Sequence, residues 1–243
     1  MGTKLRRETL SEQVALQLLD HIRTQHLQPG MLLPSETRLC AEYSVSRQVI
    51  REALRALQGK GVLTIMNGRG AVVRPIDREA FSFVFARAIQ IDTHSLFELM
   101  EVRLALEVEC ARLAATRRTT EDVAEMREVA AQMRLHLHDE GAYGALDLTF
   151  HLLIARASRN AMLYHLLDSI REASSDAILA GLRSQRSEEQ LHHMQESHEA
   201  ILREVERRRP AAAGLIMEQH LSGAAATLAV SVCEEQPVLA TQQ

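Results

Sequence analysis

The sequence of 243 residues has little cysteine and no long apolar run. Its three cysteines, Cys40, Cys110 and Cys233, lie far apart and form no Cys-x-x-Cys motif, so a disulfide framework is not expected. Reduced thiols are typical of the cytoplasm, and we predict that location. The longest stretch without charge or histidine, residues 221–233, has 13 residues, whereas a membrane span needs about 18–20 apolar residues. No apolar run follows the first basic residues, which argues against a secretory signal.

Hydrophobic residues make up 46% of the sequence and charged residues 25%, which is enough apolar content for a full core. The charge is unevenly distributed. Residues 1–76 hold 11 Lys and Arg against 6 Asp and Glu, whereas the remainder holds 17 against 26. A basic head on an acidic body predicts that the head alone meets a polyanion, although chance composition is an alternative.

Residues 1–75 have the pattern of a winged helix-turn-helix domain. A capping-box sequence, Thr-x-x-Glu, begins a first helix at Thr9, and Ser35 and Ser46 are placed to cap two further helices. Two short β-branched runs follow, joined by an Asn-Gly pair at Asn67, which is a strong signal for a β-hairpin.

The third expected helix carries Arg47, Gln48 and Arg51 in its first turns. In helix-turn-helix proteins this part of the second motif helix enters the major groove, where arginine can bind guanine and glutamine can bind adenine. Arg69 at the hairpin tip could reach phosphates or the minor groove. The alternative is an ordinary solvated face on a pair of helices.

Five short motifs in this region identify a family as well as a fold. In chain order they are Leu33-Pro34-Ser35-Glu36, Val45-Ser46-Arg47, Arg51-Glu52-Ala53-Leu54, Gly61-Val62-Leu63 and Gly68-Arg69-Gly70. In this order and spacing they resemble the GntR family of bacterial transcription regulators over roughly residues 9–75. The resemblance implies double-stranded DNA as partner, with contacts from Ser46, Arg47, Gln48, Arg51, Gly68 and Arg69. Many members carry an arginine directly after the glutamate. Here Thr37 holds that position, and Arg38 follows it as a further candidate contact.

The rest of the chain reads as mainly α-helical, with residues 76–91 as a linker and short helix and residues 92–243 as an all-helical domain. Helical periodicity persists almost to the end. Six helices are expected, near residues 95–115, 119–140, 146–157, 161–180, 187–209 and 211–232. Short connections between them imply a bundle. The expected caps are Ser95, either Thr119 or Thr120, and Ser187, the first and last as capping boxes.

Three of these helices carry polar residues on apolar stripes. Asp147 and His151 are four residues apart, while His198 and His220 each share a face with aliphatic residues. A single buried histidine is more often a satisfied core residue than a ligand. Four such groups directed into one core would each need a partner, and a divalent metal ion satisfies all four together.

The same residues resemble the FadR-like branch of the GntR family, whose C-terminal domain is called FCD. The resemblance is carried by Asp-x-x-x-His at Asp147, Ser-His-Glu-Ala-Ile at His198, Met-Glu-Gln-His-Leu at His220 and an opening helix around Arg103. It covers about residues 92–232. It implies a divalent metal held by Asp147, His151, His198 and His220, with zinc as our first choice and nickel or manganese as alternatives.

A metal with three imidazoles and one carboxylate keeps a net positive charge, which favours a small carboxylate effector. Arg103 would be a second anchor for that carboxylate, and Asn160 could donate to another of its oxygens. For Arg103 the alternative is an ion pair with Glu107 one turn further on. For Asn160 the alternative is a helix cap.

We therefore expect a metabolite-responsive regulator that binds a pseudo-palindromic operator as a homodimer, usually as a repressor, with an activator left open. One alternative is a metal-dependent hydrolase with a DNA-targeting head, in which Glu199 is the candidate base. Against it, helical neighbours point about 100° apart, so Glu199 should face away from a metal bound by His198. A purely structural metal is a second alternative.

Overall fold

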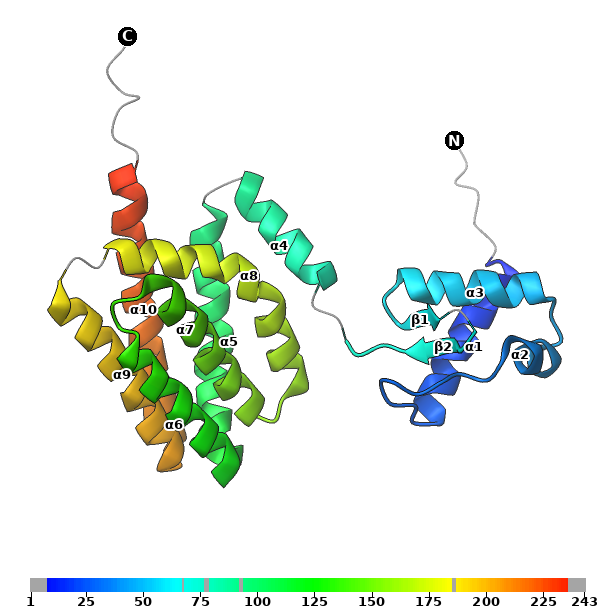
Figure 1. Ribbon diagram of the computed structural model, residues 1–243, viewed down its shortest axis with the longest axis horizontal. Coiled ribbons are helices and arrows are strands. Elements are labelled where there is room, and N and C mark those ends of the chain that lie inside the picture. Colours follow the sequence, from blue (N-terminus) through cyan, green and yellow to red (C-terminus); the bar gives the residue numbers. More distant parts are fainter. Residues whose placement is uncertain (1–7, 67, 77–78, 92–93, 185–186, 236–243) are drawn as a thin grey trace, which may run out of the picture. The chain divides into compact units, whose positions relative to one another are not determined.

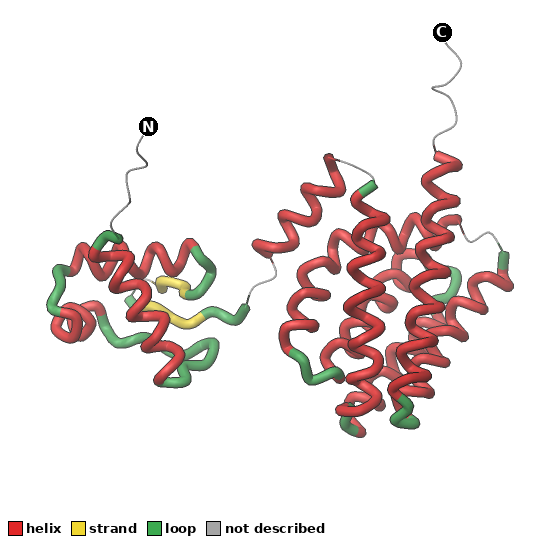
Figure 2. The backbone as a smooth tube through the Cα atoms, turned by 180° about the vertical axis from the view of Figure 1, so that it is seen from behind, coloured by secondary structure: helices red, strands yellow, loops and turns green. Residues whose placement is uncertain are grey.

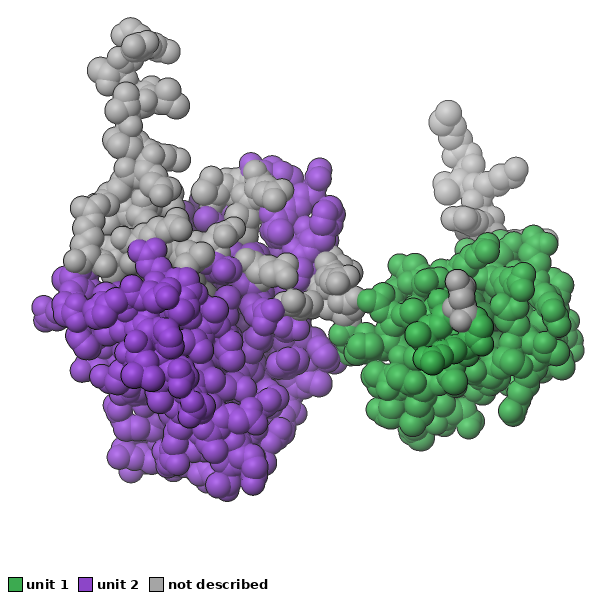
Figure 3. All heavy atoms as spheres, in the orientation of Figure 1, with its two compact units in different colours: residues 1–77 green, residues 78–243 purple. Residues whose placement is uncertain are grey.

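The computed structural model describes residues 8–66, 68–76, 79–91, 94–184 and 187–235. The chain forms two compact units, residues 1–77 and 78–243 (Figure 3). The first unit contains α1 (Leu10–Thr24), α2 (Glu36–Tyr43), α3 (Arg47–Gly59), β1 (Leu63–Met66) and β2 (Gly70–Val73). The second contains α4 (Glu79–Ile91), α5 (Ser95–Arg117), α6 (Thr120–Leu135), α7 (Glu140–Ala157), α8 (Ala161–Ser184), α9 (Glu188–Glu206) and α10 (Pro210–Glu235). The mainly helical fold is confirmed (Figure 2).

The first unit is a winged helix-turn-helix domain, as predicted. The Thr9 capping box is formed, and the Ser35 and Ser46 side chains accept backbone N–H groups at the starts of α2 and α3. Ser44 ends α2 in the left-handed conformation, with φ of 54°, and this turns the chain sharply into α3. Helices α1 and α3 close over a core whose fully buried members are Leu18, Leu39, Ile50, Leu57 and Leu63.

The wing is an antiparallel hairpin in which Leu63 faces Val73 and Met66 faces Gly70. Gly68 and Gly70 have φ of 77° and 95°, a conformation that glycine adopts without steric cost. Asn67, which the sequence analysis placed in the turn of this hairpin, lies outside the described residues. The hairpin is thus set on the core by its buried inner face and ends in a short glycine-containing tip.

The second unit is a helical bundle with α5 at its centre (Figure 1). Helix α5 contacts α7, α8, α9 and α10, while α6 packs on α7 and α9, and α4 packs on α8. The core is rich in aliphatic, methionine and alanine side chains, with Tyr143 and Phe150 fully buried among them. Each large apolar side chain buried in this way contributes about 1.5–3 kcal/mol. The bundle therefore has ample apolar content to hold polar groups in its interior.

The predicted caps of α6 and α9 are confirmed, whereas the predicted capping box of α5 and the predicted start of α7 are wrong. Capping boxes form at Thr119 and Ser187. Ser95 forms none, because it is already the first helical residue of α5 and His94 holds the cap position without a side-chain bond. Helix α7 begins at Glu140, six residues before the predicted start, because Asp139 caps it. Within the described part of the chain, no helix is long and apolar enough to cross a membrane.

Candidate metal centre and nucleic-acid interface

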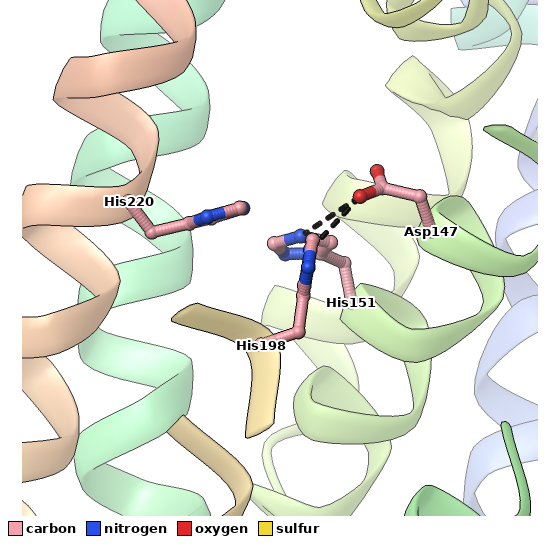
Figure 4. A group of neighbouring side chains, drawn as sticks. All are labelled: Asp147, His151, His198 and His220. Atoms are coloured by element: carbon pink, nitrogen blue, oxygen red, sulfur yellow. Dashed lines mark ion pairs between the residues drawn. The ribbon is translucent and has the colours of Figure 1, made fainter. Parts of the chain in front are cut away.

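Four side chains from three helices converge in the bundle interior (Figure 4). Asp147 and His151 come from α7, His198 from α9 and His220 from α10. Each offers one ligand atom, and these four atoms all lie within 4.8 Å of one another. The structure thus brings together all four residues that the sequence selected as metal ligands.

Helix geometry explains the convergence. Asp147 and His151 are one turn apart and share a stripe with the fully buried Phe150 and Ile154, so the packing that buries the apolar pair also turns the polar pair inward. The ring of Phe150 lies edge-on to His198, with ring centroids 5.4 Å apart. Asp147, His151 and His198 are at most 5% exposed, so they lie in the interior of the bundle.

Two buried nitrogen atoms show that this cluster fits a metal ion. The Nδ1 atom of His198 lies 3.0 Å from the carbonyl oxygen of Met194, which can only accept, so Nδ1 carries the proton. The Nε2 atom of the same ring faces Asp147 Oδ1 at 2.9 Å. Neither Nε2 of His198 nor Nε2 of His151 makes a hydrogen bond. Two buried imidazole nitrogens without a hydrogen bond, beside a buried carboxylate, are a donor set that a divalent cation can bind.

Glu107 connects the cluster to Arg103. Its Oε1 accepts from Arg103 Nε at 2.7 Å, and its Oε2 forms an ion pair with His151 Nδ1. All three side chains are buried. A carboxylate behind a histidine that is poised as a metal ligand fixes the ring and directs its other nitrogen toward the metal. The ion pair that the sequence left as an alternative for Arg103 is therefore present, and it belongs to the same cluster.

The charges in this interior stabilise one another. Burial raises the pKa of Asp147, but His151, His198 and Arg103 outweigh it and hold that pKa well below its usual range. In the same way Arg103 and His151 lower the pKa of Glu107 to about 2 despite its burial. Burial together with the other two histidines lowers the pKa of His220, so its ring is neutral and able to bind a metal.

A second chain of contacts leads from His198 to the surface, and sequence reasoning missed it. The Tyr143 hydroxyl donates to Gln195 Oε1 at 3.1 Å, and Gln195 Nε2 donates to Glu199 Oε1 at 3.0 Å. Glu199 in turn accepts two hydrogen bonds from Arg134, both 2.8 Å long. Tyr143 and Gln195 carry no distinguishing sequence signal, since each resembles an ordinary residue of a helix interior.

A cavity of about 810 Å³, which we call the α9–α10 cavity, opens beside the cluster. Arg103, Asp147 and His220 line its inner end. His192 and His193 are exposed and also line the cavity. Asn160 is not among the lining residues. Its Oδ1 accepts from the N–H groups of Met162 and Leu163 and so caps α8, which is the alternative that the sequence left open.

The three side chains expected to read bases, Arg47, Gln48 and Arg51, lie exposed on the first two turns of α3. Arg51 forms an ion pair with Glu36 of α2 at 3.0 Å, and Arg47 donates to the hydroxyl of Thr37 at 3.2 Å. Both arginines are thus braced by the preceding helix of the motif and remain open to solvent.

The other predicted DNA contacts flank these residues. The Ser46 hydroxyl caps α3, which leaves the positive end of that helix at the exposed surface. Arg38 is exposed on α2, and Gly68 and Arg69 are exposed at the tip of the wing. The surface offers cations and free N–H groups, the chemistry that binds a DNA backbone.

Comparisons with known proteins agree with both resemblances drawn from the sequence. Residues 98–223 match the family model described as the FCD domain, and residues 10–73 match that of bacterial regulatory proteins, gntR family. The HTH-type transcriptional regulator LutR of Bacillus subtilis (strain 168) is 30% identical over 208 residues, 83% of this chain and 93% of that relative. The Galactonate operon transcriptional repressor of Escherichia coli (strain K12) is 31% identical over 144 residues, 57% of this chain and 62% of that relative. The structure of Streptococcus agalactiae GntR has a TM-score of 0.73 at 26% identity, over 89% of this chain and 99% of that one.

Proposed function

The chain belongs to the gntR family of bacterial regulatory proteins and carries an FCD domain, and from this we propose a repressor that a small carboxylate releases from its operator. The protein is a DNA-binding transcription regulator of that family. Repression is supported by the name of the galactonate operon relative, which also points to an acid as the controlling metabolite. We place the protein in the cytoplasm, where its DNA lies.

DNA binding is assigned to α3 and the wing. Arg47, Gln48 and Arg51 would contact base edges in the major groove, while Arg38, Ser46, Gly68 and Arg69 would contact the backbone or the minor groove. One such helix covers only a few base pairs. A homodimer would present two copies of α3 to the half-sites of a pseudo-palindrome, as symmetric helix-turn-helix proteins do.

Asp147, His151, His198 and His220 would hold one divalent metal ion. Imidazole and carboxylate ligands suit zinc, with nickel and manganese as alternatives. When bound, the ion would supply a Lewis-acidic centre to which carboxylate oxygens bind. Glu107 and the carbonyl of Met194 keep the rings of His151 and His198 in place for this task.

Arg103 would bind the effector carboxylate at the inner end of the α9–α10 cavity. Its Nε is used by Glu107, and the side chain also lines the cavity, so the remaining guanidinium N–H groups are placed to donate to an oxyanion. The cavity is lined by residues of α5, α7, α9 and α10. An acid bound there would change the packing of these helices. A coupling of about 1–3 kcal/mol to operator affinity is sufficient for regulation.

The observation that carries this proposal is the buried cluster of four ligand atoms beside a cavity that contains an arginine. The cavity favours an effector site over a purely structural metal. The hydrolase alternative lacks support, because the relatives are named as regulators and Glu199 is held by Arg134 and Gln195.

Metal content per chain tests the proposal directly. We expect about one metal ion per chain after purification without chelator, and none in an Asp147→Ala/His198→Ala variant. The control is Asp20→Ala/His138→Ala, which removes the same two residue types from exposed positions. Duplexes selected in vitro with the full chain then serve as probes for release by hydroxy- and keto-acids. No bound metal, even after addition of zinc, nickel or manganese, would contradict the four-ligand site.

A further inference from the structure

The α9–α10 cavity is much longer than a small acid requires. From its inner end at His220 it continues along α10 to Thr227, and along α9 it includes Gln190. Thr227 follows His220 by seven positions on the same helix, a distance of about 10 Å along its axis. Helices α9 and α10 run antiparallel (Figure 1), so Gln190 and Thr227 lie at the same outer end. An acid of two or three carbons spans only about one turn, ~5 Å, of this length.

Much of the cavity wall is apolar. The apolar side chains along it are Met100, Met194, Ile216, Leu221, Ala224 and Leu228. The two methionines are unbranched and polarizable, and such side chains adapt to the shape of an apolar ligand. An alkyl ligand body would be buried favourably against these side chains, whereas ligand hydroxyl groups that face them would lack partners, which is costly.

The two ends of the cavity differ in charge. Arg103 lies at the inner end, whereas the carboxylates of Glu189 and Glu196 belong to the lining contributed by α9. A ligand with one carboxylate can place it at the inner end. A second carboxylate at the far end of the ligand would lie close to glutamate side chains and would be repelled.

We propose that the effector is a monocarboxylic acid with an extended apolar body, such as a 2-hydroxy acid of about six to eight carbons. Its carboxylate binds at Arg103 and the ligand cluster, and its alkyl chain follows α10 toward Thr227. This inference rests on the proposed function, because it assumes that the cavity takes up a carboxylate effector. It adds the length and the polarity of that effector.

Thr227 allows the outer end of the cavity to be filled without touching the inner end. It lines the cavity about two turns beyond His220, about 10 Å along the helix. A Thr227→Leu variant places a larger side chain there, and leucine favours the helix over threonine. Ser222→Leu is the matched control, because Ser222 is exposed on the same helix and does not line the cavity.

Isothermal titration calorimetry of the metal-loaded full chain tests the proposal with glycolate, lactate, 2-hydroxyhexanoate and 2-hydroxyoctanoate. We expect affinity to rise about fourfold per buried methylene. Thr227→Leu should lower affinity for 2-hydroxyoctanoate by roughly tenfold and leave lactate binding unchanged, because the larger side chain occupies only the outer end. Ser222→Leu should change neither. The dicarboxylate 2-hydroxyadipate should bind more weakly than 2-hydroxyhexanoate.

The possible failures separate the two proposals. Lactate binding with no gain along the series, or tighter binding of galactonate than of 2-hydroxyhexanoate, would overturn the inference and leave the proposed function intact. Equal loss of lactate and 2-hydroxyoctanoate binding in Thr227→Leu would also overturn it. If the metal-loaded chain binds none of the acids, the effector site itself is wrong, and both proposals fail.

Discussion

The hydroxyl oxygen of Tyr143 on α7 lies 3.3 Å from Nδ1 of His198 on α9, so a buried phenol supports a candidate metal ligand from behind. The same hydroxyl donates to Gln195. Burial and the carboxylates of Asp147 and Glu199 raise the pKa of Tyr143 above its usual value, so it keeps this proton at neutral pH. The histidine ring is therefore held on one side by Met194 and Tyr143, while its Nε2 faces Asp147.

Tyr143→Phe should weaken metal binding while preserving the fold. The variant removes a contact to the His198 ring and leaves Gln195 Oε1 without its donor, at a cost of about 1–3 kcal/mol in the free energy of unfolding. We expect the metal dissociation constant to rise roughly tenfold, as is typical when support behind a ligand is lost. Chelator competition and urea unfolding measure the two effects. Tyr164→Phe on α8 is the control, and equal metal affinity in both variants would contradict the supporting role.

Gln48→Ala and Arg47→Ala should each reduce binding to the selected operator by about 1–3 kcal/mol and relax specificity at one base position. Both side chains are exposed, so the fold should not change. Fluorescence anisotropy with operator and scrambled duplexes gives the affinity and the specificity ratio. Arg23→Ala, an equally exposed arginine that pairs with Asp20 on α1, serves as control. A loss of the same size in that variant would indicate a general charge effect.

Arg69→Ala should weaken binding to operator and scrambled duplexes by similar factors. Arg69 lies at the wing tip between Gly68 and Gly70, where it could reach a phosphate or the minor groove; a phosphate contact carries no base specificity. If it contacts one phosphate, the slope of log K against log salt concentration should become less negative by about 1. An unchanged slope in a salt titration would place Arg69 away from the backbone.

Cys110 should resist thiol reagents in the folded protein, whereas Cys40 should react. Burial, with Glu107 and Glu109, raises the pKa of Cys110 to about 12, and the thiol is 1% exposed. Its thiolate fraction at pH 8 is then lower by roughly 10³ than that of an ordinary thiol. Labelling at pH 8, in a Cys233→Ser background, should modify the partly exposed Cys40 and leave Cys110 free.

The same thiol makes the fold sensitive to alkali. In the unfolded chain Cys110 ionises near 9, whereas in the folded chain it ionises near 12, so the free energy of unfolding should fall as pH rises between these values. Cys110→Ser should reduce that slope. Rapid labelling of Cys110 in the native chain at pH 8 would contradict its burial.

Local sequence signals were enough to predict the caps of α2, α3 and α9 and to select the four ligand candidates. Ser46 and Thr119 act on backbone groups three residues away, and Asp147 and His151 share a stripe by helical periodicity alone. The early start of α7 was not predictable in this way. Gly141 and Gly144 lower its helix propensity, and the burial of Tyr143 together with the Asp139 cap offsets that cost.

The features of the site that could not be predicted depend on contacts between segments that are distant in the sequence. Glu107 is the expected neighbour of Arg103 on α5, but its second contact, to His151, depends on how α5 and α7 pack. Gln195 finds Tyr143 across 52 residues of chain. The length of the α9–α10 cavity depends on small residues such as Gly223 and Ala224, whose role is set by the space left between helices.

The head and the body each enclose a hydrophobic core of their own, and the two cores share no residue. Each part therefore has an apolar core of its own around which its helices pack. Under the proposed function, substitutions that reshape the cavity leave the residues packed beneath α3 unchanged, and the reverse also holds. A chimera that joins this body to another head should then respond to the effector of this body.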